Sequence, residues 1–111
     1  MPPPPALGEF EQVVMLAVLR LGDEAYGVPI RQEIAACTDR NPSPGALYTT
    51  LERLEEKGLV RSRFGDPTPE RGGRAKRYFT LTTRGGQALA RAQRSYQRLL
   101  EGVTLPRVAR A

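Results

Sequence analysis

The sequence contains no histidine and no tryptophan, and Cys37 is its only cysteine. Structural zinc sites are built mainly from cysteine and histidine, and a serine-type catalytic triad needs a histidine base, so this chain lacks the residues for either. A single cysteine also excludes a disulfide within the chain. Because Cys37 follows Ile34, Ala35 and Ala36 at the end of a predicted helix, we expect a packed side chain and not a reactive thiol.

Long apolar segments are also absent. The longest apolar run, residues 13–19, is far shorter than the about 20 residues that a membrane-spanning helix needs. Residues 1–5 have neither the basic start nor the apolar centre of a signal peptide. We therefore predict no membrane partner and a cytoplasmic protein, with residues 1–6 as a disordered proline-rich leader and 105–111 as a flexible tail.

Charge is distributed unevenly along the 111 residues, which are enough for one domain with a modest core. The formal net charge is +5, but residues 1–60 carry five basic and nine acidic side chains, whereas residues 61–98 carry ten basic and only two acidic ones. A concentrated basic region attracts nucleic acid and releases counterions on binding. A solvated surface with no ligand is the alternative interpretation of such a region.

Hydrophobic periodicity predicts three helices, a hairpin and a final helix. Residues 10–21 repeat at helical spacing and are apolar almost all round at their centre, so this helix needs a second partner besides its own core. In the second helix, Val28, Ile30, Ile34 and Cys37 mark the inner side. The third begins at Ser43 or Pro44, with serine as the N-cap, and ends at Gly58.

The third helix divides into two faces. Leu47, Leu51 and Leu54 fall at i, i+4 and i+7 and must face inward. This spacing turns small or hydrogen-bonding residues toward the other side, where they permit close approach to base edges and phosphates: Gly45, Ala46, Thr49, Thr50 and Arg53. Tyr48 borders both faces, so a core role and a phosphate-contacting role remain open for it.

A basic hairpin follows the third helix. Residues 59–64 alternate like a strand, with Arg61 and Arg63 on one face, and residues 77–81 form its partner. The connection is rich in glycine and proline and too long for a tight turn, so it should project as a loop. Cations on its returning side suit contact with a nucleic-acid backbone: Arg71, Arg74, Lys76 and Arg77.

The last helix, capped by Thr82 or Thr83, carries an apolar stripe. Its members recur at steps of three and four residues: Leu89, Ala92, Tyr96, Leu99 and Val103. The stripe either folds back on its own domain or pairs with a second subunit. We favour the second subunit, because the first helix also has surplus apolar surface.

The predicted order is that of a winged helix-turn-helix followed by a dimerisation helix, a mainly α fold with a small β-hairpin. Four segments, in this order, resemble the PadR family of bacterial transcriptional regulators: Leu7-Gly8-Glu9-Phe10-Glu11, Gly22-Asp23-Glu24-Ala25-Tyr26-Gly27, residues 45–60, and Pro69-Glu70-Arg71-Gly72-Gly73-Arg74 with its continuation to Thr82. The resemblance covers about residues 7–100, and the short C-terminal region is similar to that of the family's short subgroup.

The resemblance implies a homodimeric repressor of the bacterial nucleoid that binds double-stranded DNA, needs no cofactor and is not an enzyme. It implies a winged-helix domain at 7–82, with the third helix in the major groove, and a dimerisation helix at 83–104. Matched by position, the DNA contacts are Ser43, Gly45, Ala46, Tyr48, Thr49, Arg53, Arg71, Arg74, Lys76 and Arg77. The dimer contacts expected from the first and last helices are Phe10, Val14, Leu89, Ala92, Tyr96, Leu99 and Val103.

Three questions stay open at this point. Many members of this family are released from DNA by small aromatic or hydrophobic molecules, and Phe10, Met15, Tyr26 and Tyr96 are candidates to border such a pocket, although aromatic residues at helical spacing are more often core. A protein-docking winged helix without operator preference is the alternative function. An enzyme is disfavoured because no acid–base pair is evident, and single-stranded RNA binding because no exposed stacking platform is evident.

Overall fold

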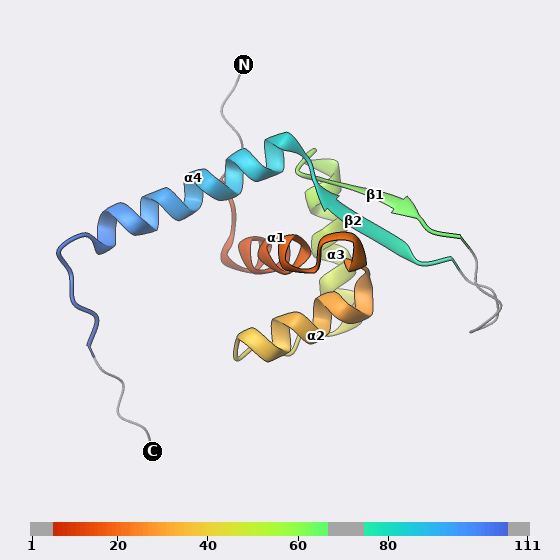
Figure 1. Ribbon diagram of the computed structural model, residues 1–111, viewed down its shortest axis with the longest axis horizontal. Helices are drawn as coiled ribbons and strands as arrows, with labels where there is room; N and C mark the ends of the chain where they lie inside the picture. Colours follow the sequence, from red (N-terminus) through yellow and green to blue (C-terminus); the bar gives the residue numbers. More distant parts are fainter. Residues whose placement is uncertain (1–5, 67–74, 107–111) are drawn as a thin grey trace.

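The computed structural model, which describes residues 6–66 and 75–106, has the predicted order of elements. Its helices are α1 (Glu9–Leu21), α2 (Gly27–Cys37), α3 (Pro44–Glu56) and α4 (Thr83–Leu100), with a short 3₁₀ turn, η1 (Gly22–Glu24), after α1. Strands β1 (Val60–Phe64) and β2 (Arg77–Leu81) form an antiparallel hairpin. Figure 1 shows α1, α2 and α3 grouped together, with the hairpin and α4 extending in opposite directions.

Local chemistry explains where the helices begin and end. The Ser43 Oγ accepts a hydrogen bond from the Ala46 amide at 3.1 Å, and the Thr82 Oγ1 accepts one from the Gly85 amide at 3.0 Å, so both predicted N-caps are confirmed. Gly58 has a φ of 75° just beyond α3, a conformation that favours glycine and turns the chain into the hairpin.

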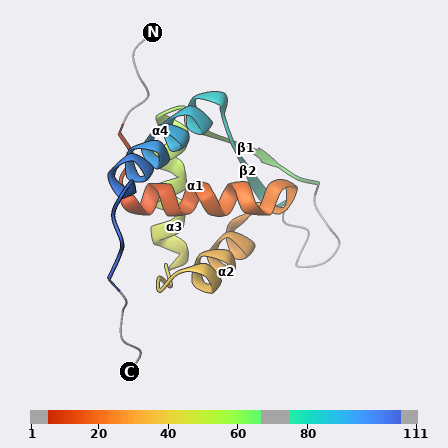
Figure 2. The same cartoon turned by 60° about the vertical axis from the view of Figure 1, so that its left-hand side comes forward.

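Helix α1 lies at the centre of the core. Val14 and Met15 are completely buried, and Figure 2 shows α1 crossing between α4 and α2. Leu47, Leu51 and Leu54 of α3 are also completely buried, which confirms the predicted inner face of that helix. Because burial of these three leucines is favourable, the opposite side of α3 faces outward.

The hairpin has a third, minimal partner that the sequence analysis missed. Tyr26 forms an isolated antiparallel bridge with Tyr78, and the Phe79 amide donates to the Ala25 carbonyl at 2.8 Å. Phe79 is buried, so β2 is held between β1 on one side and the start of α2 on the other. The hairpin of β1 and β2, called the wing below, is therefore joined to the helical body along its base.

Three predictions about side-chain burial were wrong. Thr50, expected on the outer face of α3, is only 6% exposed, because it lies three residues after Leu47 and four before Leu54 and so belongs to the same buried stripe. Cys37, expected inside, is exposed because the last turn of α2 extends past the core beyond Ile34. Val28, at the start of the same helix, is also exposed.

The end of the last helix also differs from the prediction. Helix α4 stops at Leu100 and not near residue 104, and Gly102 follows with a φ of 72°. Val103 therefore lies beyond the helix that was expected to carry it. The tail from 107 onward, the leader from 1 to 5 and the loop residues 67–74 are outside the described residues.

Candidate nucleic-acid interface

The N-terminal half of α3 presents a surface of small side chains. Ser43, Gly45, Ala46 and Thr49 are all exposed, and a Cβ built on Gly45 would meet no neighbouring atom within 4 Å. Arg53 is exposed one turn further on, at the end of the same surface. A helix start of this kind combines unpaired backbone amides and a positive dipole end with room for close approach.

Tyr48 connects the outer surface of α3 to the core. It is half-buried, its ring packs edge-on against Phe79 with centroids 6.4 Å apart, and its hydroxyl lies directly against Gly27. A Cβ on Gly27 would approach the Tyr48 hydroxyl to 2.5 Å, so a larger residue at the start of α2 would displace the Tyr48 ring. The tyrosine thus sets the distance between α2 and α3.

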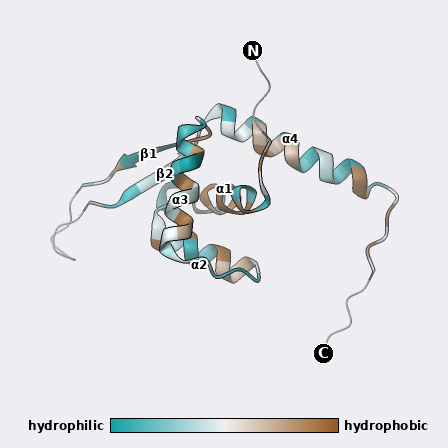
Figure 3. Ribbon diagram, turned by 180° about the vertical axis from the view of Figure 1, so that it is seen from behind, coloured by the Kyte–Doolittle hydropathy of each residue, from teal (hydrophilic) through white to brown (hydrophobic). Residues whose placement is uncertain are grey.

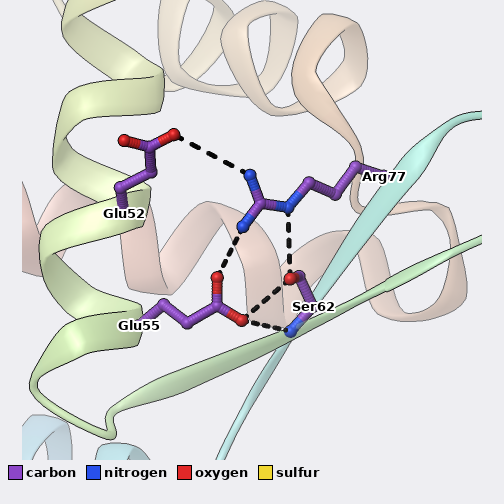
Figure 4. A network of polar contacts seen from close by, with 4 residues as sticks. All are labelled: Glu52, Glu55, Ser62 and Arg77. Carbon is purple, nitrogen blue, oxygen red and sulfur yellow. Dashed lines mark hydrogen bonds and ion pairs between the residues drawn. The ribbon is translucent and has the colours of Figure 1, made fainter.

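The C-terminal half of α3 is acidic and is joined to the hairpin by Arg77. Figure 4 shows the Arg77 guanidinium among three residues, with Nη2 2.6 Å from the Glu55 Oε1, Nε 3.1 Å from the Ser62 Oγ and Nη1 3.9 Å from the Glu52 Oε1. The Glu55 Oε2 also accepts hydrogen bonds from the Ser62 hydroxyl and amide. The bond from the Ser62 hydroxyl, together with the Arg77 charge, lowers the pKa of Glu55 below its ordinary value.

This placement changes the role of one predicted DNA contact. Arg77 was expected beside the loop as a phosphate-binding cation, and the structure instead commits it to Glu55, Ser62 and the Phe79 ring, 5.1 Å from its guanidinium carbon. Lys76 lies immediately before β2 and contacts Tyr26. Arg71 and Arg74 are outside the described residues.

The predicted dimer residues fall into two groups. Val14 and Leu89 are buried in the domain's own core, so the single chain does not present them on its surface, and their assignment to a subunit interface stays a prediction. Phe10 and Ala92 are half-buried, while Tyr96 is 51% and Leu99 76% exposed on the distal part of α4. In Figure 3 the last turn of this helix, away from the body of the domain, is coloured hydrophobic after a stretch of mixed and mostly hydrophilic colouring.

The four residues suggested for an effector pocket are not brought together within one chain. Met15 is fully buried, Tyr26 packs against Tyr78, and Tyr96 is exposed on α4. A groove of about 340 Å³ lies instead between α1 and α2, and its lining is mostly apolar: Val13, Leu16, Ala17, Arg20, Glu33, Ile34, Cys37 and Thr38. Leu16 and Leu19, on the outer side of α1, are exposed.

A metal site and a membrane-spanning helix were also considered for the described part of the chain. No three histidine, cysteine, aspartate or glutamate side chains lie together there as metal ligands would. Within residues 6–66 and 75–106, no helix has the length and apolar character that a bilayer crossing demands.

The fold and the exposed start of α3 define a winged helix-turn-helix protein of the DNA-binding class. The profile of the Transcriptional regulator PadR-like family matches residues 15–91. Transcriptional regulator Rv3488 of Mycobacterium tuberculosis is 37% identical over 83 residues, which are 73% of this chain and 71% of that protein. The chain belongs to the PadR-like family, so it is a DNA-binding transcriptional regulator, and the family is one of regulators, not enzymes.

Solved structures agree on the fold. A PadR family transcription regulator from Clostridium difficile R20291 superposes with a TM-score of 0.69 at 22% identity, covering 84% of this chain and 93% of that one. A PadR family regulator from Eggerthella lenta gives a TM-score of 0.65 at 26% identity, covering 85% and 81% of the two chains. The predicted family and the predicted fold class are both confirmed.

Proposed function

We propose that the protein is a homodimeric repressor that inserts α3 into the major groove of a palindromic operator and rests its wing on the flanking backbone. The observation that carries this proposal is the outer surface of α3, where Ser43, Gly45, Ala46 and Thr49 are exposed. Small and hydroxyl-bearing side chains at a helix start allow the backbone to approach phosphates and the hydroxyls to reach base edges. Repression would follow from occlusion of a promoter.

The division of labour along α3 follows from charge. Its N-terminal half carries no acidic residue, whereas Glu52, Glu55 and Glu56 lie in its C-terminal half. We therefore assign base contacts to Ser43 and Thr49, with Tyr48 and Arg53 reaching phosphates at the border. Lys76 supplies the wing contact within the described residues, and the resemblance adds Arg71 and Arg74 beyond them.

The dimer in this proposal uses the unpartnered apolar side chains of α4. Tyr96 and Leu99 lie mostly in solvent in the single chain, as does Leu19 on α1. Burial of such side chains against a second copy is favourable. The wing and α3 at 7–82 then act as the DNA-binding domain and 83–104 as the dimerisation segment, with half-sites about one helical turn apart.

Two further parts of the proposal concern regulation and location. We extend it to release from DNA by a small hydrophobic or aromatic effector, which is supported by the resemblance and by the apolar groove between α1 and α2. A regulator of chromosomal promoters acts on the nucleoid, so the proposal locates the protein in the bacterial cytoplasm.

The test is selection of a duplex from a random-sequence pool, followed by titration of that duplex and of a scrambled version across a salt series. We expect a preference for the selected duplex that persists at physiological salt. Thr49→Ala should mainly reduce this preference, whereas Lys76→Ala should weaken both duplexes alike and reduce the salt slope by about 1. Equal affinity for both duplexes would instead favour the protein-docking alternative.

A further inference from the structure

The outer face of the wing carries a pair of packed tyrosines. Tyr26, the residue before α2, and Tyr78 of β2 meet edge to face, with ring centroids 5.4 Å apart and planes at 68°. They come from elements about fifty residues apart and are joined by the β-bridge at the base of the wing. Gly65 packs beneath the Tyr78 ring, where a Cβ would come within 2.8 Å, so this ring is covered on one side by backbone.

Each ring holds one cation. The Arg63 guanidinium carbon lies 4.6 Å from the centre of the Tyr78 ring. The Lys76 Nζ lies 4.6 Å from the centre of the Tyr26 ring and 3.5 Å from its hydroxyl oxygen. In the parts of the chain that the structure describes, neither cation has a carboxylate partner, in contrast to Arg77.

A cation above an aromatic ring keeps more of its N–H donors available than a cation in an ion pair does. The ring restrains the position of the charge but occupies few of its N–H donors, which stay available for phosphate oxygens. Both cations lie where the hairpin opens into its loop, since the Gly65 amide donates to the Lys76 carbonyl at 2.8 Å as the outermost bond between the two sides within the described residues. The loop edge is where a wing meets the DNA backbone.

We infer that Tyr26 and Tyr78 are positioning residues for DNA binding, which hold Arg63 and Lys76 as a pre-arranged pair of phosphate contacts on the outer face of the wing. Because the cations are restrained before binding, less conformational freedom is lost when DNA arrives. Arg63 is a DNA contact additional to those predicted from the sequence. The inference rests on the proposed function, since it names a further part of the same interface.

The experiment is a pair of double-mutant cycles read out by affinity for the duplex that the wild-type protein selects. Tyr26→Leu and Lys76→Gln should each weaken binding about two- to fivefold, equally for selected and scrambled duplex, and the double variant should bind no worse than Lys76→Gln alone. Tyr26→Phe keeps the ring and should retain most of the wild-type affinity. Tyr78→Leu with Arg63→Gln forms the second cycle and decides the question alone if Tyr26→Leu does not fold.

Arg61→Gln is the matched control, because Arg61 lies on the same face of β1 and no ring packs against it among the described residues. Its effect should simply add to that of Tyr78→Leu. Full additivity in the Arg63 or Lys76 cycle would show that the tyrosines act through the fold alone and would overturn the inference. If the wild-type protein selects no duplex, the proposed function itself fails, which is a distinct outcome.

Discussion

The network around Arg77 offers the sharpest test of how the wing is fixed to α3. Arg77→Met removes the guanidinium while keeping an unbranched stem that can still cover Phe79. The variant loses the contacts to Glu55 at 2.6 Å and to the Ser62 hydroxyl at 3.1 Å. We expect the free energy of unfolding to fall while the fold is retained.

The size of the loss follows from exposure. The side chains of Arg77 and Glu55 are 26% and 33% exposed, so the pair lies between a buried and a surface ion pair. A hydrogen bond to a charged group contributes about 1.5–3 kcal/mol when well shielded, and an exposed pair contributes under about 1 kcal/mol. Glu55 keeps both hydrogen bonds from Ser62 in this variant, so its carboxylate is not left without hydrogen-bond donors. We therefore expect a loss of about 1–2 kcal/mol for Arg77→Met.

Urea unfolding at one fixed protein concentration measures this loss, because a dimer's stability depends on concentration. Arg61→Met on the neighbouring strand is the control and should change stability by less than about 0.5 kcal/mol. A double-mutant cycle with Glu55→Gln should give a coupling of about 1 kcal/mol. A coupling near zero, or equal losses for the two arginine variants, would refute the idea that this network anchors the wing.

Three further outcomes are expected. Gly85→Ala should destabilise the protein by about 1–3 kcal/mol in urea unfolding, because a Cβ there would overlap the Leu59 carbonyl, whereas Gly86→Ala meets open space in the same helix and should stabilise by about 0.5–1 kcal/mol; similar effects of both would contradict this packing. Leu99→Glu should shift the protein toward monomer in analytical ultracentrifugation, and an unchanged dimer would exclude α4 as the proposed interface. Burial raises the pKa of Glu11, but the Lys57 ammonium and the Gly8 backbone amide lower it by more than burial raises it. The net pKa therefore lies below the ordinary 4.5. That carboxylate should therefore contribute stability above about pH 4.5 that is lost as pH falls through its folded pKa, and Glu11→Gln should flatten this acid limb of the stability curve.

Periodicity and caps made most of the fold predictable. The Leu47, Leu51 and Leu54 spacing, the Ser43 cap and the glycine after α3 are local signals, and each is realised in the structure as expected. Thr50 was misplaced because its polarity was given more weight than its position within the buried stripe. Position decides here, because Thr50 lies on the same side of the helix as Leu47 and Leu54.

Long-range pairing was the part that the sequence did not reveal. The contact between Tyr26 and Tyr78 depends on which segment pairs with β2 at the base of the wing. No short-range signal in the sequence specifies that bridge. The partner of Arg77 lies 22 residues away on another element. For the same reason, the apolar stripe of α4 could not be divided in advance into the part packed inside, at Leu89, and the part left exposed, at Leu99.

In the proposed complex, the two faces of the hairpin would allow an acidic helix and a basic wing to meet one DNA surface. The face toward α3 carries Arg77, which offsets the charge of Glu52 and Glu55 where α3 would otherwise repel phosphates. The outer face carries Arg63 and Lys76 above aromatic rings, and within the described residues neither cation is paired with a carboxylate. The basic excess of residues 61–98 therefore overstates the positive charge available to DNA, because Arg77 is already paired with carboxylates of α3. Loss of Arg77 should thus weaken DNA binding through the uncompensated charge of Glu52 and Glu55, whether or not Arg77 itself contacts a phosphate.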